Sequence, residues 1–88
     1  SMVKIASSPT FVKQFNKSDP ALKLEVKEKI EALTNRANHH QLRVHKLHGQ
    51  LKNCYGFSVN YKWRIIFTWI DKGEVYLLTL GDHDVYKN

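Results

Sequence analysis

The chain has 88 residues, which is enough for one domain with one hydrophobic core and too few for a second catalytic domain. Hydrophobic residues make up 42% and charged residues 25%, as in ordinary soluble globular proteins, and no apolar stretch is long enough to span a bilayer. The only cysteine, Cys54, excludes an internal disulfide framework and a cysteine-rich metal site. The first residues lack the apolar segment of a signal peptide, so we expect a single cytoplasmic domain over residues 1–88.

The net charge of +6 is concentrated in one part of the chain. From Ala32 to Ile70 no acidic residue occurs, whereas the same segment contains six cations: Arg36, Arg43, Lys46, Lys52, Lys62 and Arg64. The other eight basic residues balance the eight acidic ones. A surface of one sign attracts polyanions, so nucleic acid is weighed evenly against a solvated basic face or an acidic protein partner.

The first half of the chain predicts one short strand and two helices. Val3–Ser7 reads as a strand, and Ser8 followed by Pro9 is a typical helix start, with Phe11 and Phe15 on one face of the helix. The same cap-then-proline signal opens a second helix that extends to about residue 36. Its apolar side chains form one stripe, which consists of Leu22, Val26, Ile30 and Leu33.

The second half changes to the period of strands, after a loop in which we expect His39 and His40 to be solvated. The expected strands are Tyr55–Val59, Trp63–Ile70 and Val75–Leu80, the last two joined by a hairpin turn. The order is therefore β-α-α-β-β-β. It predicts an α+β fold in which a helical hairpin packs on a mainly antiparallel sheet of four strands.

This order and several short motifs resemble the RelE/ParE toxin superfamily. The motifs are VHKLHG over Val44–Gly49, WRIIF over Trp63–Phe67 and LGDHDVY over Leu80–Tyr86. They are similar to the family's "K-L-x-G" segment, its "-R-I-I-F/Y-" strand and its closing "-G-x-[RH]-x-x-x-Y-" pattern. The resemblance implies a RelE-like fold and the toxic half of a type II toxin–antitoxin pair.

Members of this family act in two unrelated ways, and the residues must decide between them. RelE-like and YafQ-like members cleave mRNA at the ribosome without a metal, whereas ParE-like members inhibit DNA gyrase and have no nuclease site. The resemblance also implies an antitoxin that wraps the toxin, in a complex that binds its own promoter DNA through the antitoxin. A third possibility is an inactive remnant that only binds its antitoxin.

Four residues match the family's catalytic positions in the nuclease branch. Metal-free RNA cleavage needs a base, an acid, a cation for the phosphate and an aromatic ring for the base of the nucleotide. The resemblance assigns these roles to His45 as base or phosphate ligand, Arg64 as phosphate ligand, His83 as general acid and Tyr86 as the aromatic group. The structural alternatives are a solvated His45, an Arg64 paired with an aspartate, a structural His83 and a Tyr86 packed on the sheet edge.

Further basic residues are expected to bind RNA electrostatically, and these are Arg43, Lys46, Lys52 and Lys62. His45 and His48 have no third ligand at a suitable spacing, so we expect no metal and no cofactor. RelE-like members carry lysines where this chain has Tyr55 and Phe57, and YafQ-like members carry a histidine and an aspartate near Ser58 and Lys62. Neither full active site is present, which keeps the inactive remnant open as an alternative.

Overall fold

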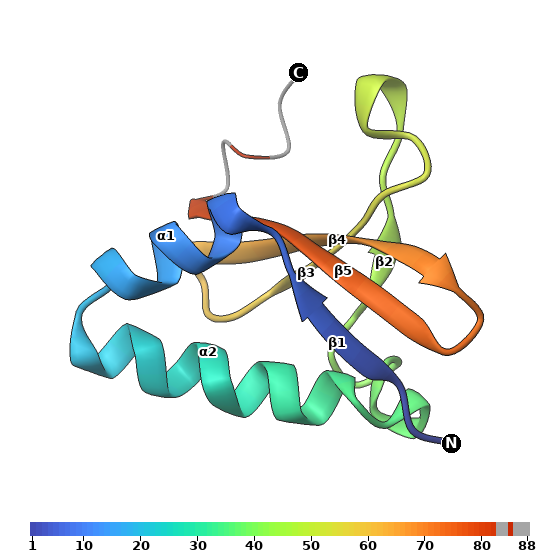
Figure 1. Ribbon diagram of the computed structural model, residues 1–88, viewed down its shortest axis with the longest axis horizontal. Coiled ribbons are helices and arrows are strands. Elements are labelled where there is room, and N and C mark those ends of the chain that lie inside the picture. Colours follow the sequence, from blue (N-terminus) through green and yellow to red (C-terminus); the bar gives the residue numbers. More distant parts are fainter. Residues whose placement is uncertain (83–84, 86–88) are drawn as a thin grey trace.

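The computed structural model describes residues 1–82 and 85, and two helices pack there against one mixed sheet (Figure 1). The elements follow one another as β1 Lys4–Ser7, α1 Pro9–Lys17, α2 Pro20–Leu33, β2 His45–Lys46, β3 Tyr55–Ser58, β4 Trp63–Asp71 and β5 Glu74–Asp82. Short 3₁₀ helices cover Arg36–Asn38 (η1) and Gly49–Leu51 (η2).

The sheet has the strand order β1-β5-β4-β3-β2, with β1 parallel to β5 and every other pair antiparallel. The predicted α+β class is confirmed. The predicted number of four strands is wrong, because His45–Lys46 adds a fifth strand, β2, at the edge beside β3. Two residues are too few to show the alternation by which a strand is recognised in a sequence.

Both helices begin where the cap-then-proline signals predict. The Ser8 hydroxyl accepts a hydrogen bond from the amide of Phe11 at 2.9 Å, and the Asp19 carboxylate accepts one from the amide of Leu22 at 2.8 Å. Each bond satisfies an amide of the first helical turn, which has no partner within the helix. The second helix ends at Leu33, earlier than predicted, since Thr34 caps it and the chain then turns.

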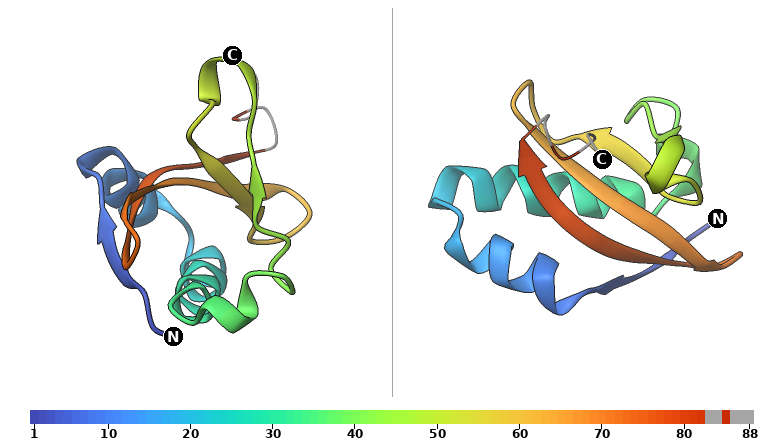
Figure 2. Two further views of the ribbon diagram at one scale, coloured as in Figure 1. Left: turned by 90° about the vertical axis from the view of Figure 1, so that its right-hand side faces the viewer. Right: turned by 90° about the horizontal axis from the view of Figure 1, so that it is seen from above.

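The core lies between α2 and the sheet, and Figure 2 shows this helix on one side of the sheet, end-on in the left view and lengthwise in the right. The predicted stripe on α2 supplies Leu22, Val26 and Leu33 to it. Strands β3, β4 and β5 and the residue after β3 supply the other side of the core: Phe57, Val59, Ile65, Phe67, Val75, Leu77 and Leu80. Alternation along these strands leaves the opposite sheet face, here called the far face, to another set of residues.

Helix α1 lies beside the edge of the sheet and covers β5 where β1 has ended. The side-chain oxygen of Gln14 accepts a hydrogen bond from the amide of Leu80 at 2.7 Å, and its nitrogen donates to the Thr79 hydroxyl at 2.9 Å. An uncovered strand edge would present such amides to solvent or to another chain. Gln14 therefore hydrogen-bonds the edge of β5 near its end, as β1 does near its start.

Candidate functional site

The sheet register places His45 and Arg64 on the same face. His45 pairs with Gly56, which pairs with Ile66, while Arg64 pairs with Ser58 on one side and Gly81 on the other. Residues directly opposite one another in antiparallel strands point to the same face. Ile65 next to Arg64 points into the core, so Arg64 and His45 point to the far face, away from α2.

The separation of these two residues suits a group bound between them. Strands β2 and β4 are separated by β3 alone, and the two residues lie one diagonal step apart. Standard strand spacings put their Cα atoms roughly 12 Å apart. A guanidinium and an imidazole can both reach a phosphodiester across such a distance.

The guanidinium of Arg64 is held by backbone carbonyls. Its Nη1 donates to the carbonyl of Asn60 at 2.7 Å and to that of Trp63 at 3.2 Å. The side chain is half-buried, and its hydrogen bonds come from one of the two terminal nitrogens. These bonds hold the group through Nη1, and its other N–H groups are donors that can bind a phosphate.

The imidazole of His45 is oriented by its own loop. Its Nδ1 lies 3.0 Å from the carbonyl oxygen of Arg43. A carbonyl oxygen only accepts, so Nδ1 must carry the hydrogen, and in a neutral ring Nε2 then carries the lone pair. Arg43 itself has a φ of 58°, which is a left-handed conformation that few non-glycine residues adopt. The turn at Arg43 thus both begins β2 and orients the ring of His45.

The last two candidates, His83 and Tyr86, lie outside the described residues. Their neighbour Val85 is described, and a Cβ atom placed on Gly81 would stand only 3.2 Å from the Cβ of Val85. Val85 therefore packs over Gly81, the direct strand partner of Arg64. Glycine at position 81 allows this close approach on the far face.

The four residues expected to bind RNA occupy three different places. The segment that contains β2 and η2 projects from the sheet and is here called the basic arm, residues 43–54 (Figure 1). Arg43 begins this arm, Lys52 follows η2, and both are exposed. Lys46 is exposed on the same arm but pairs with Tyr55, so it points to the opposite side from His45. Lys62 lies in the turn between β3 and β4, with its Nζ 5.4 Å from the ring centre of Trp63.

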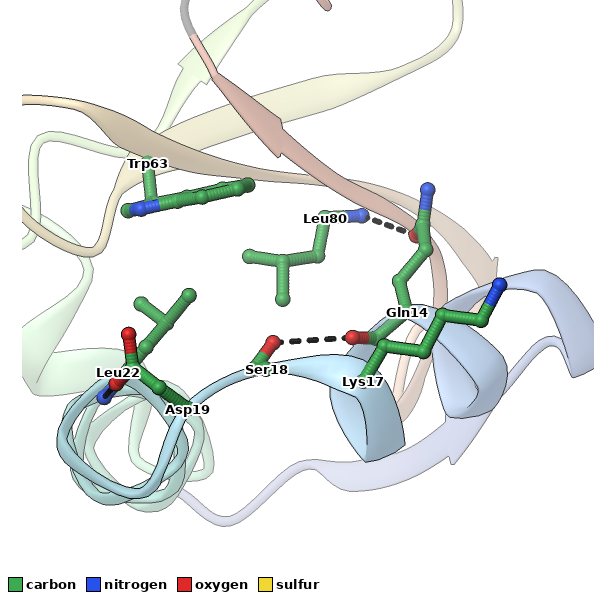
Figure 3. A pocket seen from close by; sticks show the side chains of 7 residues that line it. All are labelled: Gln14, Lys17, Ser18, Asp19, Leu22, Trp63 and Leu80. Carbon is green, nitrogen blue, oxygen red and sulfur yellow. Dashed lines mark hydrogen bonds between the residues drawn. The ribbon is translucent and has the colours of Figure 1, made fainter.

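A separate hollow of about 450 Å³ lies at the end of the helical hairpin, away from the far face (Figure 3). Trp63 lies flat over it, and Leu22 and Leu80 form its apolar floor. Lys17, Ser18 and Asp19 lie at the link between the helices, where they border the same space. An open, mainly apolar hollow of this size suits the side chain of a partner protein.

Comparison with known proteins identifies the fold. No family model matches the chain, and no curated relative matches it in sequence. Solved structures match almost the whole chain: a chain of the YoeB–YefM complex from Staphylococcus aureus has 15% identity and a TM-score of 0.74, with 94% and 99% of the two chains covered. YafQ from E. coli has 16% identity and a TM-score of 0.73, with 98% and 99% covered. RelE–RelB from Pyrococcus horikoshii has 16% identity and a TM-score of 0.72, with 93% and 96% covered.

The chain has the fold of these YoeB–YefM, YafQ and RelE–RelB structures. The TM-scores of 0.72–0.74 establish this fold, and identities of 15–16% leave the activity to be argued from the site. In this chain, Tyr55 stacks on Phe67 with ring centres 5.7 Å apart, and Phe57 is fully buried. The far-face residues of β3 are Gly56 and Ser58, so this strand contributes no cation to the site.

The prediction that both loop histidines are solvated is wrong for one of them. His39 is half-buried, and its Nε2 lies 2.7 Å from the carbonyl oxygen of Leu33 at the end of α2. Its ring also lies 6.1 Å from that of Trp69. His39 therefore caps the helix. No sequence signal separates it from His40, because the carbonyl it binds is selected by the path of the loop.

Asn60 is the site residue that the sequence interpretation missed. Its side-chain oxygen accepts hydrogen bonds from the amides of Lys62 and Trp63 at 2.9 and 2.8 Å, and its own carbonyl holds Arg64. An asparagine at the start of a turn commonly bonds the backbone two residues further on. That signal was available in the sequence, where Asn60 stands between two expected strands.

The described residues show neither a metal site nor a membrane span. In residues 1–82 and 85, no three His, Cys, Asp or Glu side chains gather as a group able to hold a metal ion. None of the helices in this part of the chain is long and apolar enough to cross a membrane.

Proposed function

We propose that this chain is the toxin of a type II toxin–antitoxin pair and a metal-independent, ribosome-dependent mRNA endonuclease. The observation that carries the proposal is the placement of Arg64 and His45 together on the far face, at a spacing that fits a phosphodiester. A protein that only occupies a partner's surface has no need of a histidine and an arginine on one face of the sheet.

In the proposed reaction the 2′-hydroxyl attacks the adjacent phosphate. His45 takes the proton from the 2′-hydroxyl at Nε2, the O2′–P bond forms and the P–O5′ bond breaks. Arg64 stabilises the extra negative charge on the phosphate oxygens. His83 gives a proton to the leaving 5′-oxygen, and Tyr86 stacks on the base of the nucleotide. The products are a 2′,3′-cyclic phosphate and a 5′-hydroxyl end.

The proposed partners are a cognate antitoxin, the ribosome with its mRNA, and promoter DNA reached through the antitoxin. YoeB–YefM from Staphylococcus aureus is a toxin–antitoxin heterotetramer, and its fold likeness to this chain supports an antitoxin partner here. The hollow under Trp63 offers an anchor for apolar antitoxin side chains. The acid-free basic arm suits ribosomal RNA.

Expression of the chain in cells without an antitoxin tests the function directly. Labelled methionine incorporation should fall before thymidine incorporation, and primer extension should show cleavage within coding mRNA. Arg64→Ala and His83→Ala should each abolish most of this cleavage. If thymidine incorporation falls first and mRNA stays intact, the chain is a ParE-like gyrase inhibitor.

An inactive remnant that binds only its antitoxin is the second candidate. One observation favours it: β3 carries Gly56 and Ser58 on the far face, so Arg64 lacks a second cation on the neighbouring strand. A remnant would leave both translation and replication unaffected while the chain still bound its antitoxin.

A further inference from the structure

The turn between β3 and β4 presents an aromatic side chain entirely to solvent. Tyr61 is 92% exposed, which is the largest exposed fraction among the large apolar side chains of the described residues. An aromatic ring so placed stabilises the fold of this chain very little, because it buries almost no surface. Its position must therefore be explained by something other than the packing of the core.

The turn that holds Tyr61 is firmly hydrogen-bonded. The side-chain oxygen of Asn60 accepts from the two amides that follow Tyr61, and the amide of Val59 donates to the carbonyl of Trp63 at 2.8 Å. The side-chain nitrogen of Asn60 donates to the Glu25 carboxylate of α2 at 3.1 Å. The turn is thereby joined to the helical layer, so little conformational freedom remains to be lost when Tyr61 binds a ligand.

The surroundings of Tyr61 favour a polyanionic ligand. Lys62 follows it directly, and the guanidinium of Arg64 bonds the carbonyl of Asn60, which directly precedes it. All of these residues belong to the acid-free segment between Ala32 and Ile70. Two carboxylates line the same space as Tyr61, and both accept hydrogen bonds: Glu25 from the side chain of Asn60, and Asp19 from the amide of Leu22. An exposed ring in a basic segment is typical of surfaces on which unpaired bases stack.

We propose that Tyr61 is a stacking platform for a base of single-stranded RNA, next to the nucleotide whose phosphate binds Arg64. Lys62 contacts the phosphate of the stacked nucleotide. Because Asn60 holds both the turn and the guanidinium, the base contact and the phosphate contact have a fixed spacing. This inference rests on the proposed RNA-cleaving function and adds to it a group that selects the position of the strand.

The test uses the full chain and a short, dye-labelled single-stranded RNA at low salt, with fluorescence anisotropy as the readout. Tyr61→Ala should weaken binding about 5- to 100-fold, the loss expected for one stacked base. Tyr61→Phe retains the ring and should bind within about twofold of the wild type. Leu24→Ala is the matched control, because Leu24 is a 60% exposed apolar residue on the outside of α2.

A second series of RNAs, each with one abasic position, identifies the interaction. One abasic position should weaken wild-type binding about as much as Tyr61→Ala does, and the same position should have no effect on Tyr61→Ala. If Tyr61→Ala binds every RNA with the affinity of Leu24→Ala, Tyr61 is not a stacking platform. If Tyr61→Ala instead loses binding to the antitoxin, the ring is a protein contact. Failure of the proposed function has a different readout, because mRNA would then stay intact in cells that express the wild type.

Discussion

Replacement of Arg64 by alanine separates a catalytic role from a structural one. If the guanidinium stabilises the transition-state phosphate, its loss should lower the cleavage rate about 10²- to 10³-fold, as removal of one charge-stabilising donor does in comparable sites. Arg64→Lys keeps the charge and loses the two-pronged donor geometry, so it should retain an intermediate rate.

The structural cost of the same change follows from the contacts of Arg64. Its Nη1 makes two hydrogen bonds to carbonyls, of which the second, at 3.2 Å, is long. Two such bonds contribute about 1–2 kcal/mol to the free energy of unfolding. For a domain of this size, the melting temperature should then fall by about 5–15 °C. A domain that is stable by about 5 kcal/mol would remain about 99% folded, so unfolding cannot account for a hundredfold loss of rate.

Primer extension and thermal melting on the same purified variants provide the comparison. Arg64 has no catalytic role if Arg64→Ala lowers the free energy of unfolding by more than about 3 kcal/mol and the remaining cleavage follows the folded fraction. Such a result would match a buried ion pair that has lost one partner. It would mean that Arg64 maintains the sheet and that another cation binds the phosphate.

Four further substitutions test the surroundings of the site. Lys46→Ala and Lys52→Ala should each reduce the slope of log affinity for RNA against log salt concentration by about 0.7–1. Replacement of a lysine of α1 by alanine should leave this slope unchanged. An affinity independent of salt would contradict the electrostatic role of the basic arm. Arg43→Gly should raise the free energy of unfolding by up to about 1 kcal/mol, because glycine adopts the φ of 58° without strain, and chemical denaturation should find no such gain for Arg43→Ala. Gly81→Ala should lower cleavage in primer extension more than it lowers the melting temperature, because the new Cβ stands 3.2 Å from that of Val85; unchanged cleavage would show that the position of Val85 is unimportant.

The elements that the sequence predicted correctly are those fixed by local signals. Ser8 with Pro9, and Asp19 with Pro20, start the two helices where the structure has them, since a cap and a fixed φ act within one turn. The long apolar strands β4 and β5 were equally evident, because nine-residue strands carry the composition of buried sheet.

The elements that the sequence could not predict depend on contacts distant along the chain. Strand β2 exists only through its pairing with β3, and the capping role of His39 depends on where the loop returns to α2. The position of Arg64 was predictable only in part. Alternation beside a buried Ile65 predicts the face, whereas the distance from Arg64 to His45 requires the sheet order.

Backbone carbonyls hold two side chains of the far face. Arg43 orients His45 through its carbonyl, and Asn60 holds Arg64 in the same way. A carbonyl acceptor carries no full charge, so it positions each cationic or titratable group without neutralising it. An aspartate in either place would hold the same side chain more tightly and would compete with a phosphate for it. The guanidinium of Arg64 therefore keeps its full charge for an anionic ligand.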